Sequence, residues 1–581
     1  MKSQNPEFVQ IDPSERRHSV DIILPDGRII SGPRGAPVEQ FLRMLPEWRD
    51  HEPIIGAIIN SELRELTYTM DMEARVQPVT TSDSDGALIY RRSLTFLLEA
   101  AFEELFPEAR LDVDHSVASG GYFCMVSQRD PLSNSELADL ENHMRKIVKE
   151  DIPFRRTQVP IEEAIAYFRS KSLDEKVRLL KYRSKDHLVL YHLGKHVDYH
   201  HGYMVPRTSF LKWFGLEAAG EGFVLRFPRR NMPDRMIPLP DTSNLLATFR
   251  QYRHWLGRLA IDHVGALNSA IEEGRIREII LVSEALHERK ISEIASQISQ
   301  RRDQVRVILI AGPSSSGKTT FSKRLSVQLM AQGISPFALE MDNYFVDREL
   351  TPLDENGEYD FEVIEALDTE LLQEHLHQLI AGKEVHLPSF DFKSGKRISG
   401  EIVRLVPEQV IILEGIHGLN PGLIPNIPGE QSFRLYASCL TQLNLDRYNR
   451  ISTTDTRLIR RIVRDARERG YSATDTIRRW ESVRRGEKRH IYPYQENADE
   501  MFNSALVFEL AALKPLAEPL LRQVNYGEPE HIEAKRLLAF LEWFLPLQTD
   551  LIPDNSLIRE FIGGSIFKDF RLWDSSSVPL R

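Results

Sequence analysis

The chain has 581 residues, with 74 lysines and arginines against 85 aspartates and glutamates, and its formal net charge is −11. This acidic balance argues against a broad nucleic-acid-binding surface, although it is compatible with a local basic patch. Cys124 and Cys439 are the two cysteines, which excludes a disulfide framework and a four-cysteine metal site. No apolar run reaches the ~18 residues of a membrane span, and the start MKSQNPEFVQ lacks a signal-peptide pattern. We therefore expect a cytoplasmic protein with no membrane partner.

Residues 1–82 alternate β-rich runs with turn signals. SVDIILPDGRIISGP predicts a hairpin around Asp26-Gly27, PVEQFLRML predicts a short helix, and PIIGAIINSELREL predicts further strands. The polar run TSDSDG at 81–86 interrupts this pattern, so it indicates the first domain boundary.

Residues 83–238 mix helical and β-rich patterns. RRSLTFLLEAAFEELFP and NSELADLENHMRKIVKE predict helices, whereas GYFCMVSQ and LVLYHLGKHVDYHHGYMVP are β-rich. Residues 239–303 are mostly helical by period and predict a linker. From 304 to 525 strand runs alternate with helices, as a parallel sheet requires, and 526–581 predicts a helical tail.

Four histidines fall in one short block, at His192, His196, His200 and His201. In a helix three of them would share a face, but Gly194 and the flanking Val, Leu and Tyr residues predict strand and turn. We therefore expect surface or stacking histidines here and not a metal site.

The stretch GPSSSGKTTF has the spacing of a phosphate-binding loop and lies between an apolar strand pattern and a helix pattern. Its glycines let successive N–H groups point at phosphate oxygens, and the helix N-terminus adds positive potential. Lys318 is expected to reach the β- and γ-phosphates, and the Thr319 hydroxyl to hold Mg²⁺. An ordinary Gly/Ser-rich turn is the competing interpretation. The predicted nucleotide-binding residues are Gly312, Pro313, Ser314, Ser315, Ser316, Gly317, Lys318, Thr319 and Thr320.

Two carboxylates follow predicted strands after this loop. Asp342 ends ALEMD, where it can accept a proton from an attacking hydroxyl. Glu414 ends QVIILE, where an acid can hold the Mg²⁺ of a phosphoryl transfer. A helix cap or a solvated loop carboxylate is the alternative for each.

Residues 457–489 hold twelve Arg/Lys against five Asp/Glu. A solvated helix face, a nucleic-acid patch and a lid closing on ATP are the competing interpretations. The spacing of Arg457, Arg460, Arg461 and Arg464 places guanidinium groups on one side of a helix, where they can stabilise charge on a transferring group. This favours the lid, while a solvated face stays the alternative from Arg478 onward.

These motifs, together with YDFEVIEALD and PSFDFKSGKR, occur in the order found in the uridine kinase and phosphoribulokinase family, which the chain resembles over about 304–500. The resemblance implies phosphorylation of a sugar hydroxyl, with ATP and Mg²⁺ as cofactors and a nucleoside 5′-hydroxyl as the expected acceptor. Asp342 falls on the family's base, Glu414 on its magnesium-binding acid and Asp360 on its ribose-binding acid. The catalytic set is then Asp342, Lys318, Arg461, Arg464 and Arg469, the metal set is Thr319 and Glu414, and the substrate set is Asp360, Tyr344, Phe390, Phe392 and Arg397.

Two positions depart from the uridine kinase pattern. Gly395 stands where those enzymes carry a base-contacting His, and Tyr471 stands where they carry another lid Arg. A glycine has no side chain for a pyrimidine edge, and the loss of such a partner changes discrimination steeply. Uridine is therefore the leading expectation among nucleosides, and a phosphorylated sugar or another small alcohol is the alternative acceptor.

The N-terminal half resembles threonyl-tRNA synthetase. LPDGRII and GAIINSELREL look like its β-grasp TGS domain, and residues ~87–230 look like its editing domain. At that enzyme's four editing positions this chain has Arg92, Phe96, His200 and Met204. Arg stays protonated and Phe has no lone pair, so we expect the metal site to be degenerate and the editing chemistry to be lost.

The expected fold is thus a multidomain α/β protein. It comprises a TGS-like β-grasp domain (1–82), an α+β editing-like domain (83–238), a helical linker (239–303), a P-loop NTPase kinase domain with a parallel sheet (304–525) and a helical tail (526–581). An RNA contact through the N-terminal domains, a regulatory role and a homo-oligomer stay open as partner hypotheses. An RNA-binding regulator that uses ATP as a switch is the alternative function.

Overall fold

The computed structural model describes residues 18–49, 52–117, 120–239, 243–354, 357, 359–391, 393–406, 408–441 and 443–570. The predicted substrate residue Phe392 lies outside them. The chain divides into two compact units. Unit 1 comprises Met1–Pro160, His187–Leu239 and Tyr526–Ile532, and unit 2 comprises Ile161–Asp186, Pro240–Asn525 and Glu533–Arg581. The finer division into five segments stays a prediction.

Unit 1 begins with a mixed five-stranded sheet in the order β2-β1-β5-β3-β4, where β1 and β5 run parallel. The predicted hairpin is confirmed, with Gly27 in the left-handed conformation (φ +86°) that its tight turn requires. Phe41 and Leu42 of the short helix are buried in the core of this part. The elements are β1 (Ser19–Ile23), β2 (Ile29–Pro33), α1 (Val38–Leu42), β3 (Ile54–Ile59), β4 (Glu62–Glu65) and β5 (Ala74–Thr80).

The rest of unit 1 combines two long helices with two antiparallel sheets, in the orders β11-β12-β7-β6 and β10-β9-β8. Helix α3 begins with the capping box that Ser133 and Glu136 form, which satisfies two of its free N–H groups. The elements are α2 (Ser84–Leu105), β6 (Arg110–Val117), β7 (Gly121–Ser127), α3 (Asn134–Lys149), β8 (Arg155–Pro160), β9 (His187–Leu193), β10 (His196–Asp198), β11 (Gly215–Ala219) and β12 (Gly222–Arg226).

Among the residues described, five helices that precede the predicted 304–525 segment belong to unit 2. The segment predicted as a linker forms α6 (Ser243–Leu259), α7 (Val264–Glu272) and α8 (Ile276–Gln300). Two helices from inside the editing-like region, α4 (Ile161–Ser170) and α5 (Asp174–Leu180), also belong here. Lys176 of α5 lies 3.6 Å from Asp446, and both side chains are fully buried, so this ion pair fixes α5 to unit 2.

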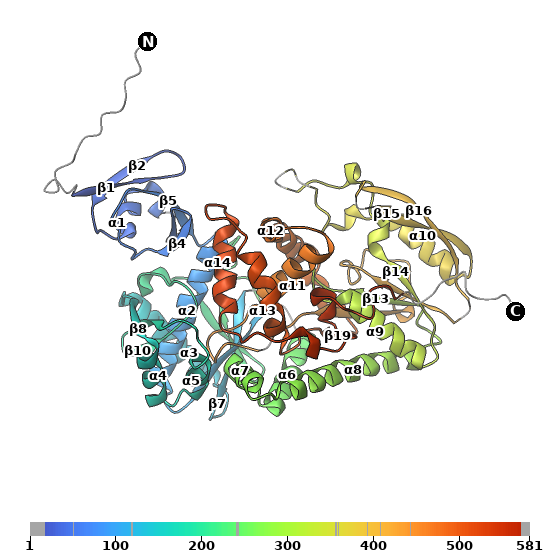
Figure 1. Ribbon diagram of the computed structural model, residues 1–581, viewed down its shortest axis with the longest axis horizontal. Helices are drawn as coiled ribbons and strands as arrows, with labels where there is room; N and C mark the ends of the chain where they lie inside the picture. The colour runs from blue at the N-terminus through green and yellow to red at the C-terminus, as the bar shows by residue number, and fades with distance from the viewer. Residues whose placement is uncertain are drawn as a thin grey trace, which may run out of the picture. The chain divides into compact units, whose positions relative to one another are not determined.

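The centre of unit 2 is a five-stranded parallel sheet in the order β14-β17-β13-β18-β19, which confirms the predicted α/β class. Its central strand, VILIA, is buried at all five residues, as a strand covered on both faces should be. In Figure 1 the β15–β16 hairpin lies beside α10. The strands are β13 (Val307–Ala311), β14 (Pro336–Glu340), β15 (Glu384–Asp391), β16 (Lys396–Arg404), β17 (Val410–Glu414), β18 (Ser432–Ser438) and β19 (Glu500–Asn503).

The remaining helices of the sequence follow the strands of this sheet or close the chain. They are α9 (Lys318–Ala331), α10 (Thr369–Ile380), α11 (Thr453–Glu468), α12 (Ala473–His490), α13 (Glu509–Leu521), α14 (Glu530–Leu541) and α15 (Arg559–Ile562). Within the ranges that the structure describes, no helix is both long and apolar enough to cross a membrane.

Candidate active site

The loop between β13 and α9 has no room for a side chain at Gly312 or Gly317. A Cβ on Gly312 would lie 1.9 Å from the Ala437 carbonyl oxygen, and one on Gly317, at φ +85°, would lie 2.4 Å from Leu557 Cδ2. The hydroxyls of Ser315 and Ser316 are buried and have no hydrogen-bond partner among the described residues. Buried hydroxyls normally have partners, so a loop that leaves two unpaired fits a phosphate group.

Lys318 is the first residue of α9 and lies almost completely inside the protein. Its ammonium donates to the Pro313 carbonyl at 3.3 Å. Desolvation raises the pKa values of the three carboxyls Asp342, Glu362 and Glu414, and the positive charge of Lys318 opposes each of these shifts. A single ammonium therefore lies among three acids at the carboxyl edge of the sheet, where Asp342 and Glu414 were predicted.

Thr319 and Glu414, the predicted magnesium ligands, meet directly. The Thr319 hydroxyl donates to Glu414 Oε2 at 3.1 Å. Glu414 is the last residue of β17, and it lies beside Ile310 of the parallel strand β13. Desolvation raises the Glu414 pKa to about 7, while the Lys318 charge opposes the shift. Hydroxyl and carboxylate oxygens are hard ligands, so this pair fits Mg²⁺.

Asp342 lies in a 3₁₀ turn over Met341–Tyr344, directly after β14, and its side chain is exposed. Desolvation by the surrounding protein raises its pKa, Glu340 adds to the shift, and Lys318 and Arg469 oppose it. The structure thus brings the predicted base to the same edge as the phosphate loop.

Glu362 is an acid of this site that the sequence prediction missed. Desolvation, reinforced by Glu487, raises its pKa to about 8, and the charges of Arg461 and Lys318 lower it. One of its carboxylate oxygens is buried without a hydrogen-bond partner in the described chain. The predicted Asp360 instead accepts the Glu362 backbone N–H at 3.0 Å. Both acids lie in EYDFE, and the pattern alone did not separate the turn-forming acid from the buried one.

Three predicted lid arginines converge on one buried carboxylate, Asp465. Arg461 Nε lies 3.2 Å and Arg464 Nη2 2.8 Å from it, and Arg469 Nε lies 3.7 Å away. Arg461 also donates to the Ser314 hydroxyl at 2.9 Å, so this group is already joined to the phosphate loop.

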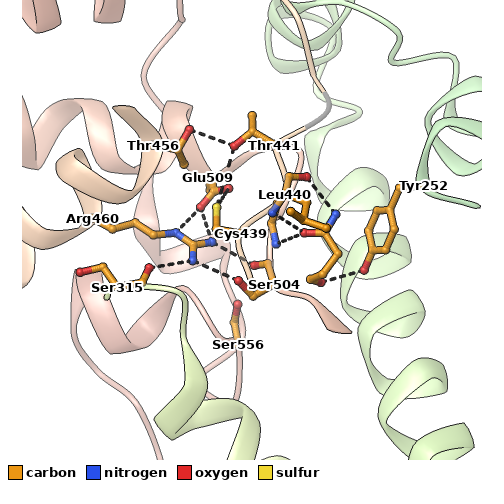
Figure 2. A network of polar contacts seen from close by, with 12 residues as sticks. Tyr252, Ser315, Cys439, Leu440, Thr441, Thr456, Arg460, Ser504, Glu509 and Ser556 are labelled. Carbon is orange, nitrogen blue, oxygen red and sulfur yellow. Dashed lines mark hydrogen bonds and ion pairs between the residues drawn. The ribbon is translucent and has the colours of Figure 1, made fainter. Parts of the chain in front are cut away.

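The other two arginines of the run, Arg457 and Arg460, do not lie on a lid surface with these three. Both are fully buried. Arg457 pairs with Glu487 and donates to the Ser314 carbonyl at 2.9 Å. Arg460 pairs with Glu509, at 2.6 Å, and donates to the carbonyls of Ser504 and Ser315 (Figure 2). Arg457 and Arg461 do share a face of α11, since both guanidinium groups lie over the Trp480 ring. Arg457 and Arg460 brace the backbone of the phosphate loop.

The predicted substrate residues lie mostly in the wall of the site. The Tyr344 ring is completely buried, with its hydroxyl 3.1 Å from His375 Nδ1, and Phe390 packs in the same core. These placements argue against a direct contact of either ring with a substrate. Arg397 donates to Asp368 at 2.7 Å. Gly395, at φ +70°, lies in the turn between β15 and β16.

A segment near the C-terminus, residues 556–567, lies against the phosphate loop, and no sequence pattern predicted this contact. Glu560 Oε2 accepts the Thr320 N–H at 3.2 Å and its hydroxyl at 2.9 Å. Lys323 donates to the Phe567 carbonyl at 2.7 Å, and Arg467 to the Phe561 carbonyl at 2.6 Å. A carboxylate therefore lies at the N-terminus of α9, where a phosphate is expected.

Residues 307–509 match the family model of the "Phosphoribulokinase / Uridine kinase family". Over these residues the chain is therefore similar to a family of kinases. Among solved structures, a putative fructose transport system kinase from Silicibacter sp. is 23% identical, covers 36% of this chain and 98% of its own, and gives a TM-score of 0.29. A possible uridine kinase from Bacillus stearothermophilus is 22% identical, covers 36% and 100%, and gives a TM-score of 0.25.

The N-terminal part is similar to threonine–tRNA ligases. That of Desulforamulus reducens is 29% identical over 194 residues, which are 33% of this chain and 30% of the ligase. That of Lawsonia intracellularis is 30% identical over 164 residues, 28% of this chain and 25% of the ligase. The chain thus spans about a third or less of the length of these curated relatives.

Proposed function

We propose that unit 2 transfers the γ-phosphate of ATP to the 5′-hydroxyl of a nucleoside and that uridine-like nucleosides are the preferred acceptors. The observation that carries this proposal is the group of three acids, Asp342, Glu362 and Glu414, around Lys318 beside the phosphate loop. A nucleotide-binding loop alone would need no acid positioned to accept a proton. The family match of 307–509 supports a kinase and ATP as the donor.

Each group in the site has a role in this reaction. The N–H groups of the loop and Lys318 hold the phosphates, and Asp342 takes the proton of the acceptor hydroxyl. Mg²⁺, when bound by Thr319 and Glu414, supplies positive charge against the phosphate oxygens. Arg461, Arg464 and Arg469 stabilise the charge that develops on the transferring group.

Glu362 is the acid that we assign to the acceptor side. Its unpaired, buried carboxylate oxygen is available to a hydroxyl donor, whereas the Asp360 carboxylate already accepts a backbone N–H. A protonated or hydrogen-bonded Glu362 fits a site that must orient a neutral sugar. Asp360 then supports the turn that positions Glu362.

The test combines an acceptor panel with one substitution. Pure protein is incubated with ATP, Mg²⁺ and each common nucleoside, phosphorylated sugar and small alcohol, and ADP release and product mass are followed. We expect turnover with nucleosides and a loss of about 10²–10⁴-fold in Asp342→Asn, with ATP binding retained. Asp303→Asn, at an exposed position after α8, is the matched control. Wild-type turnover in Asp342→Asn would exclude this residue as the base, and turnover with sugars alone would exclude a nucleoside acceptor.

A second candidate function concerns unit 1 and rests on the similarity of the N-terminal part to threonine–tRNA ligases. It is that unit 1 contacts structured RNA while unit 2 binds ATP. The full chain should then bind tRNA with an affinity that falls steeply as salt rises, because phosphate contacts release counterions. Absence of binding at low salt would exclude this role.

A further inference from the structure

A buried group of acids and histidines lies in unit 1, remote in the sequence from every kinase motif. Glu99, on α2, is 1% exposed and is contacted by two imidazoles. His196 Nε2 lies 3.3 Å from Glu99 Oε2, and His200 Nε2 lies 2.9 Å from Glu99 Oε1. His196 and His200 are therefore buried, and the prediction of surface histidines was wrong for both. They do stack, since both rings pack edge-on against Phe96.

Asp198 completes a compact set of donor atoms. One nitrogen of His196 and one carboxylate oxygen each from Glu99 and Asp198 all lie within 4.8 Å of one another, and all three residues are buried. His196 and Asp198 are two apart on the short strand β10, so their side chains leave the same face of that strand. Metal–ligand bonds of about 2.0–2.2 Å put two donors of one ion no more than ~4.4 Å apart. The donors thus need small side-chain movements to share one ion.

Second contacts hold these donors in place. His196 Nδ1 lies 2.6 Å from Glu103 Oε2, so the ring's other nitrogen, Nε2, is directed toward Glu99. Glu103 lies one helical turn after Glu99 on α2. A carboxylate on the far nitrogen of a ligating histidine fixes its tautomer and orientation, and this arrangement is usual around protein-bound metals. His200 Nε2 contacts the other oxygen of Glu99, Oε1, and so restricts the orientation of this carboxylate.

The electrostatics of the group favour a cation. Glu99 and Asp198 are two carboxylates with almost no exposure, and a buried charge is costly unless an opposite charge compensates it. Two imidazoles contact Glu99, and a divalent ion held between Glu99 and Asp198 would compensate the negative charge of both carboxylates.

We propose that Glu99, His196 and Asp198 bind one divalent transition-metal ion, with Glu103 and His200 as positioning residues. One imidazole nitrogen and two carboxylate oxygens suit Zn²⁺ and Mn²⁺, and three protein ligands leave a coordination position for water. The ion would join α2 to β10. Of the four positions that correspond to the synthetase editing site, His200 is a positioning residue here and Phe96 packs against both histidine rings, so the three proposed ligands lie outside those four positions.

The test measures metal binding by the full chain. Protein carrying Glu414→Gln, so that the magnesium ligands of unit 2 contribute no ion, is stripped with chelator and titrated with Zn²⁺ and with Mn²⁺ by calorimetry. We expect one ion per chain for at least one of the two metals. Asp198→Asn should abolish this binding, and circular dichroism checks that the variant is folded.

Glu103→Gln keeps the test decisive if Asp198→Asn fails to fold. The Glu103 side chain is 51% exposed, so its substitution leaves the core intact, and we expect an affinity loss of about 10–100-fold. Glu104→Gln is the matched control: its side chain is 52% exposed on the same helix, and it contacts His143 at 2.7 Å. It should leave the affinity unchanged. Absence of stoichiometric binding of both metals, or equal effects of Glu103→Gln and Glu104→Gln, would overturn the proposal and leave a proton-sharing ion network.

Discussion

Substituting Arg460 by Met tests whether the buried ion pair behind the phosphate loop supports both stability and nucleotide binding. Arg460 is 0% exposed, pairs with Glu509 and donates to two carbonyl oxygens (Figure 2). The methionine fills a similar volume but leaves the Glu509 carboxylate buried without its cation. Breaking a buried pair from one side costs about 3–5 kcal/mol of unfolding free energy. With a urea m-value on the order of 2 kcal/mol per M, the midpoint of unit 2 should fall by roughly 2 M.

The double variant Arg460→Met/Glu509→Leu separates the two effects. It removes both charges, and replacing a buried pair by apolar residues is often neutral, so most of the lost stability should return. The contact between Arg460 and the Ser315 carbonyl does not return. We therefore expect the double variant to be nearly as stable as the wild type but to bind ATP more weakly.

Hydrogen exchange of peptides from α11 and α13, measured across a urea titration, gives the stability of unit 2 by itself. A fluorescent ATP analogue measures nucleotide binding at the loop. Glu509→Leu completes the cycle. If the double variant stays as unstable as Arg460→Met, the unpaired charge is not the cause of the loss. If it binds ATP as the wild type does, Arg460 does not position the loop.

Three further predictions concern acids of the site. Glu560→Gln should tighten ATP binding about 2- to 5-fold, because it removes an anion from the N-terminus of α9. The control Asp554→Asn, at an exposed position two residues before the C-terminal segment, should leave the affinity unchanged. Unchanged affinity in Glu560→Gln would mean that its carboxylate does not compete with phosphate. With saturating ATP and Mg²⁺, kcat/KM should rise with pH through a pKa above the usual range of an aspartate. The reason is that the raised pKa of Asp342 keeps its carboxyl protonated, and unable to accept a proton, to a higher pH. A flat profile down to pH 4 would contradict this. Glu362 has a pKa of about 8 in the folded protein against an ordinary value of 4.5, so the folded state binds the proton more tightly and stability falls as pH rises between these values. Glu362→Gln should remove this contribution to the fall in melting temperature measured from pH 5 to 9. Identical curves of melting temperature against pH for the two proteins would refute the raised pKa.

The parts of the site that were predictable from the sequence are those that topology fixes. In a parallel sheet all strands end at the same edge, so a loop after β13 and acids after β14 and β17 must lie together. Asp342, Glu414 and Lys318 needed no more than the correct identification of three strands. The phosphate loop was predictable from its spacing, although the atoms that exclude side chains at Gly312 and Gly317 belong to the distant residues Ala437 and Leu557.

The parts that were missed depend on packing between distant segments. Which arginines of α11 are buried depends on Glu487 and Glu509, which lie 30 and 49 residues after their partners Arg457 and Arg460. Glu560 reaches Thr320 across 240 residues. The spacing of the four histidines says nothing about Glu99, which contacts His196 and lies 97 residues earlier on another element.

Gly395 illustrates how a departure from a family pattern can have a structural cause. The residue adopts φ +70°, and a Cβ there would lie 2.7 Å from the Arg348 guanidinium, while the Arg348 backbone N–H donates to the Gly395 carbonyl at 2.8 Å. A histidine at this position would need both a left-handed backbone, which is unfavourable for a side chain of that size, and a displacement of Arg348. The missing imidazole and the presence of Arg348 are therefore one structural change. Gly395→His alone should therefore destabilise the β15–β16 turn, which a lower melting temperature of the variant would show.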